Sequence, residues 1–222
     1  MTDQADQEAL STAYRDIVAV LSDVDAEEEW LPTGCAGWSV RDLLFHLRGD
    51  AQRALVALAS PAGTAPDTDA VSYWTHWRPG SDGATLSRRM TRISASVYPG
   101  LRPILDSFAE TAEAVVYAAV HTDPGLAVRT QGHVLRAGDL VRTLVVEAAI
   151  HHLDLVVALD RPLPSAGPLR VVRETLDGLL GEPLPLPWDD VTYARAGTGR
   201  AALSEPDRRA LGPLAERLPL FG

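Results

Sequence analysis

Two side chains that could bind a metal ion stand one helical turn apart in an apolar stretch, VVEAAIHHLDLVVAL, residues 145–159. Glu147 and His151 are four positions apart, so their side chains are neighbours on a helix. They share a stripe with Leu144 and Leu155, which should face a core. An unpaired carboxylate in an apolar interior is costly, so Glu147 needs a partner. A hydrogen bond from His151 would satisfy it, and so would a metal ion bound by both side chains.

A third candidate ligand, His46, lies on a second predicted helix, over residues 40–59. It sits at the flank of the apolar stripe, where a helix in a bundle faces its neighbour. Two imidazoles and one carboxylate, with water in the remaining position, are typical of a catalytic zinc site. The same ligand types also suit nickel, iron and manganese. The three residues therefore predict a divalent metal site, with zinc favoured, where a metal-bound thiol or water would do the chemistry.

Two carboxylates could support these ligands. Asp50 follows His46 by four residues, and Asp154 follows His151 by three. Each could accept the N–H of the imidazole nitrogen that points away from the metal, which would fix the orientation of the ring. His152 lies about 100° around the helix from His151 and is predicted to be structural.

Four long, mostly amphipathic segments must position these groups, and they predict a mainly α fold built on a four-helix bundle. Ser39, followed three residues later by Asp42, is typical of a helix start. Pro99, Gly100 and Pro103 should kink or split the third segment. The four helices are expected over residues 4–25, 40–59, 84–120 and 140–159.

The remaining segments are shorter. Residues 125–139 contain β-branched residues and three glycines, which favour a short strand pair or an extended segment. We divide the chain into the bundle, residues 1–160, and a small α+β extension, residues 161–222. In the extension we expect a helix over 169–180, a strand in DDVTYARA (189–196) and a last short helix after Ser204. About 60 residues are few for an independent core, so the extension should pack onto the bundle and cover one end.

Composition limits the classes of partner. The net charge is −10, with 46% apolar residues, which argues against a general binder of nucleic acids or anionic membranes. No apolar run reaches the roughly 18 residues of a membrane span, and the first ten residues are polar and acidic. The single cysteine, Cys35, excludes an internal disulfide. It could approach the metal or react with a thiol cofactor, but an inert role is favoured for it. We expect a cytoplasmic monomer or homodimer that binds small molecules.

Three further residues are candidates for substrate binding. His76 and Trp77 belong to the aromatic run YWTHW in the long loop 60–83. They could line the mouth of a pocket, and simple docking of the loop explains them equally well. Arg200, in the turn GTGR, could bind a substrate carboxylate bidentately, although a structural salt bridge is the commoner role.

Two stretches together resemble a known family. PTGCAGWSVRDLLFHLRGD, residues 32–50, and the stretch 145–159 are similar to the signatures of DinB-like bundles, in their maleylpyruvate isomerase N-terminal branch. There, a Gly-Trp-Ser/Thr-Val-x-Asp turn opens the helix with the first metal histidine, which corresponds to His46. The Glu and His four residues apart correspond to Glu147 and His151. The resemblance covers roughly residues 5–160. The tail resembles actinobacterial members but is shorter than the C-terminal domain of the isomerases.

The resemblance implies a divalent metal, usually zinc, and the use of a low-molecular-weight thiol, which in actinobacteria is mycothiol. A thiol that enters the open metal position loses its proton and becomes a nucleophile. It could then act on a small electrophilic substrate, in an isomerase or an S-transferase. A metal-dependent hydrolase that needs no thiol and a non-enzymatic metal-binding or stress-response protein are the alternatives.

Overall fold

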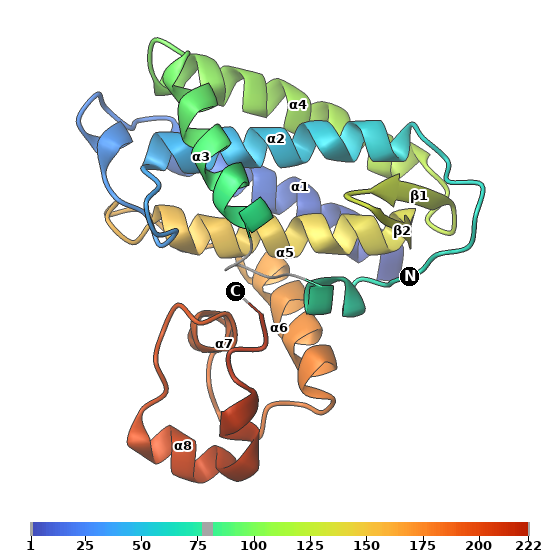
Figure 1. Ribbon diagram of the computed structural model, residues 1–222, viewed down its shortest axis with the longest axis vertical. Helices are drawn as coiled ribbons and strands as arrows, with labels where there is room; N and C mark the ends of the chain where they lie inside the picture. Colours follow the sequence, from blue (N-terminus) through green and yellow to red (C-terminus); the bar gives the residue numbers. More distant parts are fainter. Residues whose placement is uncertain (1, 77–81, 222) are drawn as a thin grey trace.

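Four helices form the central bundle of the computed structural model, which describes residues 2–76 and 82–221 (Figure 1). They are α1 (Thr2–Leu21), α2 (Val40–Leu58), α4 (Leu101–His121) and α5 (Ala137–Leu155). Both α1 and α2 pack against α4 and α5, so α1 and α2 occupy one diagonal of the bundle. The mainly α fold is thus confirmed, and α2 lies beside α5, as the metal-site prediction requires.

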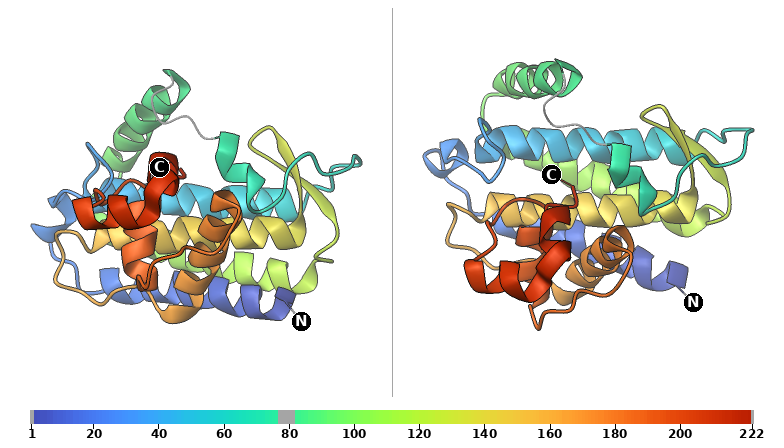
Figure 2. Two further views of the ribbon diagram at one scale, coloured as in Figure 1. Left: turned by 90° about the horizontal axis from the view of Figure 1, so that it is seen from below. Right: turned by 60° about the horizontal axis from the view of Figure 1, so that its bottom comes forward.

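The third predicted helix is split in two. Helix α3 (Asp82–Ser96) ends before residues 97–100, and α4 begins at Leu101, with Pro103 in its first turn, where no backbone donor is lost. Figure 2 shows α3 on the outside of the bundle, and its main contacts are with α2. Two short 3₁₀ helices, η1 (Glu28–Trp30) and η2 (Ser72–His76), lie in the loops on either side of α2.

The predicted strand pair is present between α4 and α5. Strands β1 (Ala127–Thr130) and β2 (His133–Arg136) pair antiparallel. Gln131 and Gly132 make the turn with positive φ angles of 47° and 86°, the conformation that two-residue hairpins favour. Helix α5 begins directly after β2, so the hairpin connects two bundle helices.

The extension consists of helices α6 (Ala166–Leu180), α7 (Asp190–Gly197) and α8 (Glu205–Leu211) and the 3₁₀ helix η3 (Gly212–Arg217). The strand predicted at residues 189–196 was therefore wrong, because this segment forms α7. Asp189 caps the helix by accepting a hydrogen bond from the Thr192 amide at 2.7 Å. Tyr193 and Ala194 are buried, so packing of one helical face overrides the β-propensity of the sequence.

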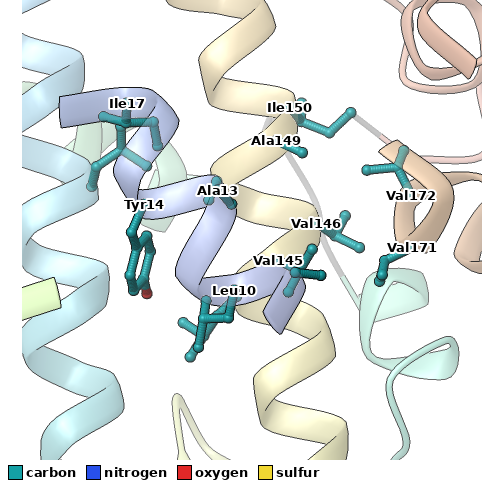
Figure 3. Packing of buried hydrophobic residues seen from close by; sticks show 14 of the residues in the cluster. Leu10, Ala13, Tyr14, Ile17, Val145, Val146, Ala149, Ile150, Val171 and Val172 are labelled. Atoms are coloured by element: carbon teal, nitrogen blue, oxygen red, sulfur yellow. The ribbon is translucent and has the colours of Figure 1, made fainter. Parts of the chain in front are cut away.

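Helix α6 packs along the side of the bundle, against α5 and α1, and does not cover an end of it (Figures 1 and 2). Figure 3 shows the core that the three helices share. Arg142 of α5 also bridges Asp6 of α1 at 3.0 Å and Glu174 of α6 at 2.8 Å. The extension thus adds a layer to the bundle core. No helix in the described ranges combines the length and apolar character needed to cross a membrane.

The bundle core can be tested at Phe108, which is fully buried and packs edge-on against Tyr14 with ring centroids 5.5 Å apart. Phe108→Ala should lower the free energy of unfolding by about 3–5 kcal/mol, because the change removes apolar contacts and leaves a cavity. Tyr117→Ala, on the exposed side of the same helix, should change it by about 0.5 kcal/mol or less. Urea unfolding of both variants checks this, and equal losses would contradict the assigned core.

Candidate metal centre

Helices α2 and α5 bring the three predicted ligands together. His46 Nε2 lies 3.4 Å from Glu147 Oε1, and His151 Nε2 lies 3.6 Å from the same oxygen. The two imidazole rings are perpendicular, with centroids 4.9 Å apart. One ligand atom from each residue lies within 4.8 Å of the other two.

The local structure of α2 sets the position of His46. Ser39 accepts a hydrogen bond from the Asp42 amide, and the Asp42 side chain accepts one from the Ser39 amide, so the predicted helix start is a capping box. Trp38, just before it, packs against His46 with ring centroids 5.0 Å apart. Its indole N–H donates to the Arg88 carbonyl of α3 at 3.3 Å. The cap and the indole together restrict where the His46 ring can lie.

The donor set fits a divalent cation. Ligand atoms around a tetrahedral ion with bonds near 2.0–2.1 Å are about 3.3 Å apart, close to the two separations from Glu147 Oε1. Asp50 Oδ2 is buried without a hydrogen-bond partner among the described residues, although His46 Nε2 lies 3.0 Å away. A buried carboxylate oxygen without a hydrogen bond, beside Nε2 of His46, fits a cation bound at this point.

The cluster is sheltered and still reachable. The side chains of His46 and His151 are 19% and 11% exposed, whereas that of Glu147 is 30% exposed. Solvent therefore reaches the cluster most readily from the side of Glu147.

The two carboxylates predicted to support the histidines lie at different ring nitrogens. His151 Nδ1 is 2.9 Å from Asp154 Oδ2, on the opposite side of the ring from Glu147, so Asp154 is placed to accept its N–H. Asp50 lies beside Nε2 of His46, the same nitrogen that faces Glu147. It is therefore not placed to accept the N–H of the far nitrogen, and its other oxygen pairs with Arg53.

Arg200 of the extension also reaches Asp154. Its Nε and Nη2 donate to the two carboxylate oxygens at 2.7 and 2.8 Å, and its Nη1 donates to the Thr198 carbonyl at 3.2 Å. Burial would raise the pKa of Asp154, but hydrogen bonds from His151 and Arg200 hold it well below the usual range. Because its planar fork already holds a protein carboxylate, we do not assign Arg200 to substrate binding. The alternative role, a structural salt bridge, is the one this geometry supports.

The contacts of Cys35 with α5 were not predicted from the sequence. Its Sγ lies 3.2 Å from Asp154 Oδ2 and 3.5 Å from His151 Nδ1. The Gly34 amide donates to the Asp154 carbonyl at 3.0 Å, and a Cβ on Gly34 would fall 2.2 Å from Asp154 Oδ1. The loop can approach α5 this closely only with glycine at position 34. Nothing in the local pattern around Cys35 indicates this contact, since it depends on how the loop docks on α5.

The pKa values of the ligand groups reflect their mutual contacts. Burial would raise the pKa of Glu147, but hydrogen bonds from His151 and His46 hold it well below its usual range. Burial lowers the pKa of His46. Burial would also lower that of His151, but the electrostatic interaction with Cys35 and the hydrogen bonds with Asp154, Cys35 and Glu147 raise it well above its usual value. His46 is thus neutral and able to bind a metal, whereas His151 must release a proton to do so.

The aromatic run of the long loop is only partly described. Trp77 and the side chain of His76 lie outside the described residues, so their predicted roles in substrate binding are not placed. Tyr73 is half-buried, and burial together with the charge of Glu147 raises its pKa to about 12. Trp74 stacks on Phe221, near the end of the chain, with centroids 4.5 Å apart. The described part of the run therefore docks between the bundle and the tail.

Comparison with known proteins identifies the family. A model of the mycothiol maleylpyruvate isomerase N-terminal domain matches residues 10–156. The chain belongs to this family of DinB-like, metal-binding helical bundles. The match includes the three clustered candidate ligands and ends before the extension. No curated protein and no solved structure matches the chain.

The pairing of Arg200 with Asp154 can be tested by a double-mutant cycle. Asp154 is 1% exposed, so Arg200→Gln should lower the free energy of unfolding by about 3–5 kcal/mol through an uncompensated buried charge. The double variant Asp154→Asn/Arg200→Gln should lose less than the sum of the two single changes. Arg102→Gln, which breaks an exposed pair with Asp106, should cost no more than about 1 kcal/mol. Additive losses in urea unfolding would show that the Arg200 contact is not coupled to Asp154.

Proposed function

We propose that this protein is a metal-dependent enzyme that uses a low-molecular-weight thiol, with mycothiol favoured, on a small electrophilic substrate. The reaction class is S-transfer or cis–trans isomerisation. The observation that carries the proposal is the convergence of His46, Glu147 and His151 around one reachable position, in a chain of the mycothiol maleylpyruvate isomerase N-terminal family. The ligand set favours zinc.

In this proposal the chain's own residues hold and orient the metal ligands. His46 and His151 would bind through Nε2 and Glu147 through Oε1. A bound divalent cation would lower the pKa of a thiol in the open position and so supply a thiolate at neutral pH. Asp154 accepts the N–H of His151 Nδ1, which fixes the tautomer that leaves Nε2 free for the metal.

The extension and the Cys35 loop keep that support in place. Arg200 donates to both oxygens of Asp154, and Cys35 donates to one of them. Three donors on one buried carboxylate leave it little freedom to rotate, so the ring of His151 is held as well. This geometry explains why a tail outside the family's matched residues would still matter to the metal centre.

The chemistry can take two forms after the thiol attacks. A new C–S bond forms as the π bond of an activated alkene breaks, and rotation about the remaining single bond becomes possible. If the C–S bond then breaks again, the product is the geometric isomer and the thiol is regenerated. If the neighbouring carbon takes up a proton instead, the thiol stays attached and the reaction is an S-transfer.

The metal assignment predicts that His46→Ala abolishes tight metal binding. Loss of a ligand should weaken binding by more than the roughly 10–100-fold that loss of a supporting partner costs. His121→Ala, at the exposed end of α4, should keep wild-type metal content. Elemental analysis of the purified proteins measures this, and unchanged metal in the His46→Ala protein would refute the site.

Metal removal should lower thermal stability, because a ligand that binds only the folded state stabilises it by mass action. Zinc at about 100 times its dissociation constant should add about 2.7 kcal/mol. For a chain of this size that corresponds to a rise in Tm of roughly 5–10 °C over chelator-treated protein. The His46→Ala protein should show little of this shift in differential scanning calorimetry. An equal shift in that variant would place the metal elsewhere.

Activity assays should separate the proposed reaction from its alternatives. With mycothiol and a panel of activated alkenes and alkyl halides, the metal-loaded protein should form thioethers or isomers, and His46→Ala should be inactive. Hydrolysis of esters or amides that is independent of added thiol would favour a metal-dependent hydrolase. Absence of turnover with every substrate, despite stoichiometric metal, would favour a non-enzymatic metal-binding protein.

A further inference from the structure

A cavity of about 520 Å³ lies beside the metal centre but contains none of its three ligands. Its walls come from η1, from the loop and first turn of α2, and from α3. The side chains that give it its chemical character are two tryptophans and four arginines: Trp30, Trp38, Arg41, Arg88, Arg89 and Arg92. Its volume is in the range of sites that hold small organic ligands.

Helix α3 turns a cationic face toward this cavity. Its cavity-lining polar residues recur at helical spacing, and they are Thr85, Arg88, Arg89, Arg92 and Ser96. The large apolar residues of the same segment are exposed to solvent by 49–80%, and they are Leu86, Met90, Ile93 and Val97. A surface helix usually presents its apolar side to the protein. Ile93 also lines the cavity, but the other five residues that α3 contributes to the lining are polar or basic.

The positive charge at the cavity is only partly balanced. Arg41 pairs with Glu29 at 3.5 Å and donates to the carbonyls of Ala95 and Tyr98. Its positive charge therefore already has partners within the protein. Asp42, the one acidic residue of the lining, is occupied in the capping box of α2.

Arg89 and Arg92, by contrast, form no hydrogen bond or ion pair among the described residues. Arg88 and Arg92 are also like charges four positions apart on a helix, an arrangement that is mildly unfavourable. The chain has 30 acidic residues against 20 basic ones, yet none of the described acids pairs with Arg89 or Arg92. An anion bound by Arg89 and Arg92 would offset the positive charge on this face of α3.

The tryptophans add flat apolar walls. Trp30 is 58% exposed, and the guanidinium of Arg41 lies 5.0 Å from its ring centroid. Trp38 lines the cavity and also packs against the metal-ligand candidate His46. A ligand in the cavity would therefore be separated from the metal centre by the indole of Trp38.

We propose that this cavity binds a small organic anion whose carboxylate or phosphate pairs with Arg89 and Arg92 and whose planar apolar part contacts Trp30 and Trp38. Guanidinium groups bind both kinds of anion bidentately, and indole rings offer flat surfaces for an aromatic or unsaturated body. This binding needs neither the metal nor the thiol, so it stands apart from the proposed reaction.

Isothermal titration with three matched probes tests the proposal on the purified wild-type protein: 2-naphthoate, 1-naphthyl phosphate and the neutral 2-naphthamide. At least one of the two anions should bind about tenfold or more tightly than the amide, and its affinity should fall as salt is raised. The tighter of the two anions identifies the charged group. The double variant Arg89→Gln/Arg92→Gln should bind that anion at least about tenfold more weakly.

A control variant removes the same charge elsewhere. Arg129→Gln/Arg136→Gln, on the exposed faces of the β1–β2 hairpin, should bind the anion within about twofold of wild type. Equal affinity for the amide and the anions, no anion binding by wild type, or an equal loss in the control variant would each overturn the proposal. None of these results would bear on metal content, so the anion site and the metal centre can fail independently.

Discussion

Asp154 is the point at which the separate parts of this molecule meet. Its side chain is 1% exposed and receives hydrogen bonds from Arg200 and Cys35, and it contacts His151 Nδ1 at 2.9 Å. A buried carboxylate is stable only when such partners compensate its desolvation. The bundle, the loop before α2 and the extension must therefore all be in place for this charge to be satisfied, and His151 is oriented as a result.

The extension therefore contributes to the surroundings of the candidate metal centre through Arg200. Helix α6 adds apolar contacts along α5 and α1 (Figure 3). The turn after α7 places Arg200 within hydrogen-bonding distance of Asp154. The family match ends at residue 156, two residues beyond Asp154. Residues beyond the family match thus contribute to the position of His151 through Arg200 and Asp154.

Much of the arrangement could be predicted from local sequence patterns. The spacing of Glu147 and His151 placed them on one face of a helix, and Ser39 with Asp42 marked the start of α2. These predictions depend on helical periodicity and capping, which act within a few residues. The strand pair near residue 131 followed equally from β-branched residues and glycines. The strand expected at 189–196 failed because burial of Tyr193 against the rest of the extension outweighed local propensity.

The sequence by itself determined the bundle, the candidate ligand pair on α5 and the chemical type of the candidate site, because each follows from short-range periodicity and residue type. Only the tertiary structure decided what surrounds them. It placed Arg200 on Asp154 and not in a substrate pocket, set Cys35 beside His151, and left Arg89 and Arg92 facing a cavity. These contacts join residues more than 40 positions apart. They depend on how loops and helices dock, and long-range contacts of this kind produce no periodic pattern in the sequence.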